Sequence, residues 1–395
     1  MTFPELDKEA WSPFQSVYSG NWYHRHMRRM TRRSLLFTGI AAGRLLGQAR
    51  KLAVFPSDAK RYPDPATELD VYRLTSPSYS SLLPAYYGRA LANNSSYMLL
   101  SCDRTGRPEV FRLDLKNAEM RQLTEVADLD PLTLTLLPDN RAFCYAAGRS
   151  VCMMTFGLKE RELYQIPEGW TRAAGMTVGP DGTHVTLIET QSDAWRMRMI
   201  SLVNGVARTV LQTSTAMIDP QPRPYRAQVM FRDGDGGVWL VNQDGQQNRQ
   251  LKLAPGTAGQ AMWSPDGRTM LYLLTPQDPK QLRAIHEFTP DSNTDKLVAK
   301  TSQFAAFTAN KDTSVFAGAS ANKGGPLVLL LLRATGNERT LCEHRASDPA
   351  MATVMFSPDS QRLYFQSDRE GKSAIYSMHI EKLVEKTSSD PLTKE

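Results

Sequence analysis

The sequence predicts an all-β fold, a seven-bladed β-propeller of four-stranded antiparallel blades. Three observations predict it: a repeated turn signature, the strand patterns after it, and a spare strand near the start. The best copies of the signature read Pro-Asp followed by Gly, Asn or Ser, and seven copies begin at residues 93, 138, 180, 224, 265, 310 and 358. Their spacing matches the length of one four-stranded blade, which is roughly 40–50 residues.

The strand patterns show why each repeat is a blade. In the fifth copy, Pro265-Asp266-Gly267 precedes the apolar run 270–273. In the last copy, Pro358-Asp359-Ser360 precedes the run 363–365, and a second strand follows at 374–378. Pro fixes φ at such a turn, and Asp and Gly accept the remaining turn geometry. Short apolar runs bounded by turn residues are typical of buried strands.

The spare strand, Asp70 to Thr75, precedes the first full copy of the repeat. We expect it to complete the last blade, because closing the ring in this way removes an open sheet edge. The predicted organisation is an N-terminal extension over 1–49, a linker over 50–69, the propeller over 70–384, and a flexible tail over 385–395.

Charge and hydropathy exclude two classes of protein. Residues 50–395 contain 40 Lys and Arg against 38 Asp and Glu, so the basic excess of the chain lies largely in its first 49 residues. So small an excess is no electrostatic footprint for a nucleic acid, and we expect no nucleic-acid partner. The chain has no run of eighteen apolar residues, so we expect no transmembrane segment in the mature chain.

The N-terminal extension has the pattern of an export signal. Thr31-Arg32-Arg33-Ser34-Leu35-Leu36-Phe37 is a twin-arginine pattern, followed by an apolar stretch to Leu46 and by the small residues Gly47 and Ala49. We expect cleavage before Arg50 and export by the twin-arginine route, giving a periplasmic or secreted monomer. The alternative is that residues 28–33 are an ordinary basic surface run.

The four cysteines do not make a disulfide scaffold in a chain of this length. Cys144 and Cys152 flank the predicted turn at Ala147-Gly148, so they could form a disulfide across two strands in an oxidising compartment. Buried free thiols are the favoured alternative, and we expect Cys102 and Cys342 to be core residues.

Familiar catalytic motifs are absent from the sequence. It has no Gly-x-Ser-x-Gly elbow, phosphate-binding glycine loop, Cys-x-x-Cys pair or His-Glu-x-x-His sequence. Residues 50–395 contain four histidines, His184, His286, His344 and His379. His286 and Glu287 are adjacent in a predicted strand, where neighbouring side chains point to opposite faces, so the two do not predict a metal site.

Several segments resemble oligogalacturonate lyases, which are seven-bladed propellers, and the repeat as a whole resembles TolB-like propellers. The matching segments lie in order and at compatible spacing: 72–75, 122–125, 238–245, 341–344 and 356–376. The resemblance implies β-elimination on pectin-derived oligogalacturonates, in pectin catabolism. In that family a manganese ion binds the sugar carboxylate while a base removes the proton from C5.

The family's metal ligands, carried over by position, are not retained. The ligand histidine before the Trp-x-Pro-Asp-Gly turn corresponds to Gln260. The later cluster of a glutamine and two histidines corresponds to Asp348, Met351 and Thr353, and the arginine beside it to Ser347. Met and Thr do not replace imidazole ligands for a transition metal, so we expect no metal and no cofactor.

Arginines are the remaining candidates for chemistry. By the same resemblance, the substrate arginine corresponds to Arg223, and the base histidine falls near Arg232. We predict Arg223 and Arg232 as catalytic residues, which would neutralise a carboxylate while one acts as base, although an arginine base needs a large pKa shift. Arg223, Arg226, Gln260 and Asp348 are the predicted substrate-binding residues.

Two non-catalytic functions remain open. A propeller can hold an acidic oligosaccharide or a partner protein in its central funnel without turning it over. A TolB-like scaffold that contacts an envelope protein is a third class. The arginines at 223, 226 and 232 could equally form a solvated face without a ligand. We expect loops such as Thr213 to Gln221 to form the functional rim.

Overall fold

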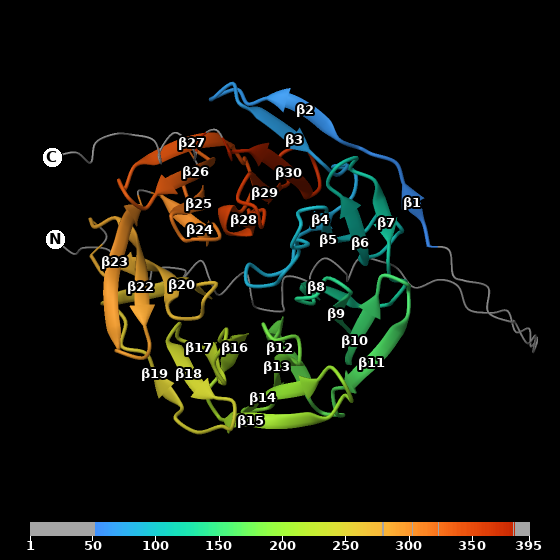
Figure 1. Cartoon of the computed structure of the whole chain (residues 1–395), viewed down its shortest axis with the longest axis vertical. Helices are drawn as coiled ribbons and strands as arrows, with labels where there is room; N and C mark the ends of the chain where they lie inside the picture. Colours follow the sequence, from blue (N-terminus) through green and yellow to red (C-terminus); the bar gives the residue numbers. More distant parts are fainter. Residues whose placement is uncertain (1–51, 279, 302, 323, 382, 384–395) are drawn as a thin grey trace, which may run out of the picture. The chain divides into compact units, whose positions relative to one another are not determined.

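A computed structural model describes residues 52–278, 280–301, 303–322, 324–381 and 383. The twin-arginine segment and the tail from residue 385 therefore lie outside the described residues. The predicted fold is confirmed, because seven antiparallel sheets form a ring around a central channel (Figure 1). Among the named elements of the described part, one is not a strand: η1 (Pro349–Met351), a single turn of 3₁₀ helix.

Each blade runs from a strand that lines the channel to a strand at the outer edge. From the channel outward, blade 1 contains β4 (Ser81–Leu82), β5 (Tyr97–Cys102), β6 (Glu109–Asp114), β7 (Met120–Gln122) and β1 (Val54–Phe55). Blade 2 contains β8 (Leu129–Leu136), β9 (Ala142–Ala147), β10 (Ser150–Thr155) and β11 (Glu160–Gln165). Blade 3 contains β12 (Thr171–Val178), β13 (His184–Gln191), β14 (Ala194–Ser201) and β15 (Ala207–Thr213). Blades 4 and 5 contain β16 (Met217–Pro222), β17 (Gln228–Asp233), β18 (Val238–Asn242) and β19 (Arg249–Gln250); and β20 (Gly256–Trp263), β21 (Met270–Pro276), β22 (Arg283–Thr289) and β23 (Thr294–Thr301). Blades 6 and 7 contain β24 (Phe304–Ala309), β25 (Val315–Ser320), β26 (Leu327–Leu332) and β27 (Glu338–Glu343); and β28 (Val354–Phe356), β29 (Arg362–Ser367), β30 (Ala374–His379), β3 (Asp70–Arg73) and β2 (Lys60–Pro63).

The seven repeated turns each join the first strand of a blade to the second. Each turn contains a residue with positive φ, and glycine fills that place in two of them, Gly182 and Gly267, with φ of 67° and 66°. The turn aspartates accept backbone hydrogen bonds from two residues further on, as Asp266 does from Arg268 at 3.0 Å. This local bond holds the turn, so the repeat depends on Asp more than on Gly.

The ring closes as the sequence predicts, and the segment before it is more ordered than expected. β3 pairs with β30 of the last blade, with Tyr72 opposite Ser377. The segment 50–69, expected to be a linker, contains β2, which adds a fifth strand to blade 7, and β1, which adds a fifth strand to blade 1. Because these short strands cover the outer edges of two adjoining blades, they reinforce the point where the ring closes.

The hydrophobic core consists of seven clusters, each packed between two neighbouring blades of the described chain. Between blades 4 and 5, for example, Met230 and Leu240 pack with Met270 and Tyr272, and each is at most 1% exposed. Burying one large apolar side chain contributes about 1.5–3 kcal/mol, so these contacts set the order of the blades.

The four cysteines are free and buried, so no disulfide forms between Cys144 and Cys152. In the hairpin of β9 and β10, Cys144 lies opposite Met153, and Cys152 lies opposite Tyr145. Cys144 packs toward blade 3 and Cys152 toward blade 1. The two thiols therefore occupy opposite faces of blade 2, where they cannot meet.

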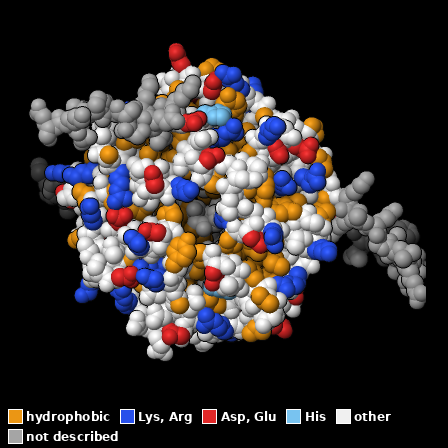
Figure 2. All heavy atoms as spheres, viewed as in Figure 1, with side chains coloured by type: hydrophobic (Ala, Val, Ile, Leu, Met, Phe, Trp, Pro, Cys, Tyr) orange, Lys and Arg blue, Asp and Glu red, His pale blue; other side chains and the backbone are white. Residues whose placement is uncertain are grey.

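The charges on one face of the propeller are mixed. Figure 2 shows Lys and Arg interspersed with Asp and Glu over one face of the propeller, around a central hollow. Within the described residues, no helix is both long enough and apolar enough to cross a membrane.

Candidate functional site

The strands that line the channel are less regular than the strands behind them. β8, β12, β16, β20 and β24 each contain extra residues that have no partner on the second strand of the blade. In β16 the break lies between Ile218 and Gln221, and in β20 between Ala258 and Ala261. Such bulges re-aim side chains and are common next to active sites. They turn Asp219 and Gln260 out of the regular alternation of their strands.

Asp219 is the most unusual residue of the channel wall. Its φ of 54° lies in the left-handed region, and of the described non-glycine residues with positive φ it alone lies within a strand. Pro220 and Pro222 follow it in the same edge strand, where a missing N–H is tolerated. Strain of this kind costs about 1–3 kcal/mol and clusters at functional sites.

A segment of blade 1 reaches across the channel to this wall. We call residues Leu83 to Arg89, which connect β4 to β5, the strap. Its Tyr86 hydroxyl donates to the backbone carbonyl of Ala261 in blade 5 at 3.2 Å. Its Tyr87 hydroxyl donates to Oδ1 of Asp219 in blade 4 at 2.8 Å. Figure 1 shows this segment, in cyan beside β4, inside the ring. The strap therefore links blades 1, 4 and 5 through the channel.

Gly175 of β12 makes room for the contact between the strap and Asp219. A Cβ at this position would lie 2.8 Å from the Tyr87 hydroxyl and 2.9 Å from the Asp219 Cα. The φ of Gly175 is also positive, at 97°. Only glycine satisfies both conditions, so the inner strands of blades 3 and 4 are adapted to each other at this point.

The electrostatics of the channel centre on the Asp219 carboxyl group. The side chain is fully buried, and its Oδ2 has no hydrogen-bond partner among the described residues. Burial raises the pKa of Asp219 to about 6, against smaller lowering effects of the Arg232 charge and the Tyr87 hydrogen bond. Arg232 lies opposite Ile218 in β17, is 5% exposed, and donates to the carbonyl of Ala258 at 2.9 Å. We call Asp219, Arg232, Tyr86 and Tyr87 the channel cluster.

The structure does not bring the two predicted catalytic arginines together. Arg223 follows the end of β16, whereas Arg232 lies opposite the beginning of that strand. The Arg223 side chain is 1% exposed and donates to both carboxylate oxygens of Asp291, at 2.8 and 3.0 Å, and to the carbonyl of Gly267 at 2.7 Å. These bonds tie blade 4 to blade 5 and leave no route for Arg223 to act with Arg232 on one ligand.

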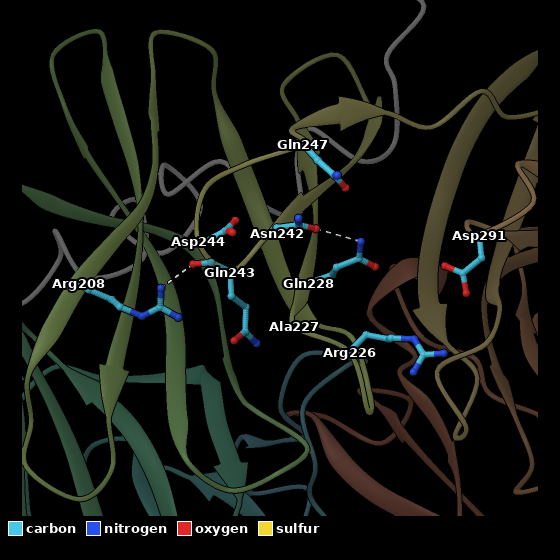
Figure 3. Close-up of a pocket in the computed structure, with 9 residues that line it drawn as sticks. All are labelled: Arg208, Arg226, Ala227, Gln228, Asn242, Gln243, Asp244, Gln247 and Asp291. Carbon is cyan, nitrogen blue, oxygen red and sulfur yellow. Dashed lines mark hydrogen bonds between the residues drawn. The ribbon is translucent and has the colours of Figure 1, made fainter.

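Arg226 lies near Arg223 at the turn but is exposed. It lines a cavity of about 550 Å³ between blades 3, 4 and 5 (Figure 3). A second cavity of about 360 Å³ adjoins the first and shares Arg226, Ala227 and Gln243 with it. Of the predicted substrate-binding residues, Arg226 is therefore placed at an open surface, away from the channel cluster.

Gln260 and Asp348 already use oxygen atoms that a metal would need. Oε1 of Gln260 accepts a hydrogen bond from the backbone N–H of Phe307 at 2.7 Å. Oδ1 of Asp348 caps η1 by accepting from Ala350 at 2.9 Å. Their bonds hold blades and loops in place, and no group of three or more His, Cys, Asp or Glu able to hold a metal occurs among the described residues. The residues present do not fit the manganese site of the resemblance.

His286 and His344 have structural partners. Nδ1 of His286 lies 2.8 Å from Asp295, whereas the neighbouring Glu287 pairs with Arg333, so the two side chains point to opposite faces of the strand as predicted. His344 is fully buried, and its Nδ1 accepts from a backbone N–H at 3.0 Å.

Asp219 and the strap were not among the predicted site residues. The segment from Thr213 to Gln221 was expected to be a rim loop, but Met217 to Pro222 is β16, so this expectation was wrong for its second half. The alternating prolines at 220 and 222 were the available signal, because proline within a strand indicates an edge strand. No local pattern predicts that Tyr86 and Tyr87 reach a blade that begins more than a hundred residues later.

Fold and site together define a seven-bladed propeller with an acidic residue in a polar channel. The model of the family described as oligogalacturonate lyase matches residues 49–200. The chain is 25% identical, over 80% of its length and 94% of the relative's, to an oligogalacturonide lyase of Pectobacterium atrosepticum. It is 24% identical, with the same coverage, to an oligogalacturonate lyase of Dickeya dadantii. The predicted resemblance to the oligogalacturonate lyase family is confirmed.

Solved structures support the same fold. An oligogalacturonate lyase in complex with manganese superposes with a TM-score of 0.79 at 24% identity, over 83% of this chain and 98% of that one. An oligogalacturonate lyase of Vibrio parahaemolyticus gives the same TM-score at 22% identity, over 84% and 99% of the two chains.

Proposed function

We propose that the chain cleaves short uronate oligosaccharides, of the oligogalacturonate type, by a β-elimination that does not depend on the manganese site of its relatives. The observation that carries the proposal is Asp219, a strained and buried carboxyl group with one oxygen lacking a partner in a polar channel. A buried polar atom without a partner costs about 1–3 kcal/mol and calls for an explanation. The names of the relatives supply the substrate class.

The channel cluster contains the groups that this reaction needs. A pKa of about 6 makes Asp219 mostly ionised at neutral pH yet more basic than an ordinary carboxylate. The Arg232 guanidinium would pair with the substrate carboxylate and make the neighbouring C5 proton more acidic. Asp219 would take that proton, the C4–O bond would break as the C4–C5 double bond forms, and the leaving oxygen would receive a proton from water. The products are an unsaturated uronate and a shortened sugar.

The proposal requires movement of the strap, because Asp219 is fully buried beneath Tyr87. That same burial favours a second candidate function, in which the propeller binds an acidic oligosaccharide or a partner protein without turning it over. In this alternative the strap keeps the channel closed, and the strained carboxyl group is only a structural support.

The test is to mix the full chain with digalacturonate and follow the ultraviolet absorbance of an unsaturated product, with manganese or with a chelator. The proposal expects the absorbance to rise equally with and without the chelator, and it expects Asp219→Asn to abolish the rise in absorbance. A rise that needs manganese would contradict it. Binding by calorimetry without any rise would establish the second candidate.

We also infer that the protein is exported to the periplasm or beyond and acts in pectin catabolism. The twin-arginine pattern at residues 31–37 supports export, and this route carries proteins that are already folded. The check is to compare the cellular location of the protein with that of a variant in which Arg32 and Arg33 are both replaced by lysine. Retention of that variant inside the cell is expected, whereas an unchanged location would contradict export by this route.

A further inference from the structure

We propose that the outer surface of blade 4 carries a second binding site for acidic oligosaccharides, separate from the channel cluster. The site is formed by the two adjoining cavities that share Arg226, and we call it the blade-4 groove. It lies at the turn of the β16–β17 hairpin, whereas Asp219 and Arg232 lie toward the other end of that hairpin. The inference goes beyond the proposed function, because a ligand bound in the groove would not meet the channel cluster.

One part of the groove is suited to the apolar face of a sugar ring. The smaller cavity is lined by Pro180, Pro222, Pro224 and Pro265, together with Tyr225. The Tyr225 side chain is 83% exposed, unlike the other large apolar residues of this hairpin. An aromatic ring beside proline rings offers C–H and π surface without charge, as sugar rings require.

The other part of the groove is rich in amide groups. Gln228, Asn242, Gln243 and Gln247 line the larger cavity, and Figure 3 shows them around its opening. Nε2 of Gln228 donates to Oδ1 of Asn242 at 3.1 Å, which fixes the orientation of both side chains. Amides both donate and accept hydrogen bonds, so a pre-oriented pair is suited to sugar hydroxyl groups.

The groove is lined by three arginines and three carboxylates, so a preference for an acidic ligand depends on Arg226; the set is Arg208, Arg223, Arg226, Asp181, Asp244 and Asp291. Asp291 lines the larger cavity and is 58% exposed, but Arg223 engages both of its oxygens; the hydrogen bond from Arg223 lowers the pKa of Asp291, and the charge of Arg226 lowers it further. The Arg226 guanidinium makes a single long contact of 3.5 Å, to the carbonyl of Tyr225, among the bonds of the described residues. Arg226 is therefore available for a carboxylate of the ligand, where a charge-assisted bond is about twice as strong as a neutral one.

His184 supplies an independent sign of a ligand site. It lines the smaller cavity and is 8% exposed, and its Nε2 has no hydrogen-bond partner among the described residues. Its Nδ1 lies 2.8 Å from the Thr183 hydroxyl, and burial lowers the pKa of the ring. An imidazole with one unpaired buried nitrogen therefore forms part of the wall beside the prolines, and an unpaired buried polar atom calls for an explanation.

The test uses the full chain with Tyr225→Trp as a fluorescent reporter and Asp219→Asn to prevent turnover. Digalacturonate is expected to change the fluorescence of the reporter relative to the same chain with Tyr225. Adding Arg226→Gln should weaken digalacturonate binding about tenfold, which corresponds to one lost charge-assisted bond. The dimethyl ester of digalacturonate should bind the reporter about tenfold more weakly and be insensitive to Arg226→Gln.

Three outcomes would overturn the site. They are an unchanged reporter signal, equal affinity with and without Arg226→Gln, and binding of tri-glutamate as tight as that of digalacturonate, which would indicate an acidic-peptide site. The outcome is distinguishable from failure of the proposed function. If the chain shows no elimination but keeps the Arg226-dependent fluorescence change, the proposed function fails and the blade-4 groove stands. If elimination occurs without that fluorescence change, the groove fails and the proposed function stands.

Discussion

The two ends of the β16–β17 hairpin carry arginines of similar burial but different surroundings. At the turn, Arg223 satisfies its guanidinium with Asp291 and with the carbonyl of Gly267 in the next blade. At the open end, Arg232 lies near a carboxyl group that keeps one oxygen without a partner. The Arg223 guanidinium is fully paired, whereas the wall beside Arg232 contains the backbone strain at Asp219. The difference indicates that Arg223 holds blades 4 and 5 together at the turn, whereas the open end keeps a buried carboxyl group that contributes no such contact.

The largest effect expected from this comparison is on stability at the turn. Arg223→Ala would leave the Gly267 carbonyl without its donor and separate blade 4 from blade 5, so we expect the free energy of unfolding to fall by about 3 kcal/mol. Chemical denaturation measures it. Arg268→Ala is the matched control, because Arg268 is 85% exposed and should change stability by less than about 0.5 kcal/mol. Equal effects of the two variants would break the comparison.

The open end should be less stable than it could be at neutral pH. The pKa of Asp219 is raised from 3.8 in an unstructured chain to about 6, so its ionisation favours unfolding. Its contribution to stability is present below pH 4 and is lost as the pH rises through 6, a loss of about 3 kcal/mol at most. Asp219→Asn should therefore unfold at a higher temperature than wild type at pH 7.5 and at about the same temperature at pH 4. A stability difference that is independent of pH would contradict the burial of a charged Asp219.

The strap contact can be tested through Gly175. Gly175→Ala would force apart the Tyr87 hydroxyl and β16 in addition to straining its own backbone, so we expect a loss of about 2 kcal/mol or more. Gly148→Ala is the control, because Gly148 also has positive φ but no atom within 4 Å of a Cβ. Gly148→Ala should lower the free energy of unfolding by about 1 kcal/mol. Thermal unfolding of the two variants at equal concentration gives the difference, and equal losses would mean that the strap does not press on β12.

The smallest effect should come from Tyr225. Its side chain is exposed, so Tyr225→Ala should change the free energy of unfolding by less than about 0.5 kcal/mol. Alanine keeps the cost of the positive φ at this position, whereas Tyr225→Gly removes it. The two variants measured together by denaturant unfolding separate these contributions. A large loss in both would show that Tyr225 supports the turn, as Arg223 does, and is not kept for a ligand.

The sequence predicted what depends on local order. Turns such as Pro265-Asp266-Gly267 and the alternating strands after them fixed the number of blades, and β3 closed the ring as expected. The site was harder to predict, because its geometry comes from contacts between distant segments. Tyr87 meets Asp219 across the channel, and a bulge with no sequence signature of its own aims that aspartate. Arg223 was assigned by position alone, and its pairing with Asp291 of the neighbouring blade could not be predicted from the sequence.

The most direct measurement of the central claim is the rate of unsaturated product formation from digalacturonate in chelator, as a function of pH, for wild type and Asp219→Asn. We expect a wild-type rate that rises with pH through about 6, as the carboxyl group of Asp219 ionises, and no rate above background for the variant. Equal rates for the two proteins, or product that forms only after manganese is added, would contradict a metal-independent elimination at Asp219.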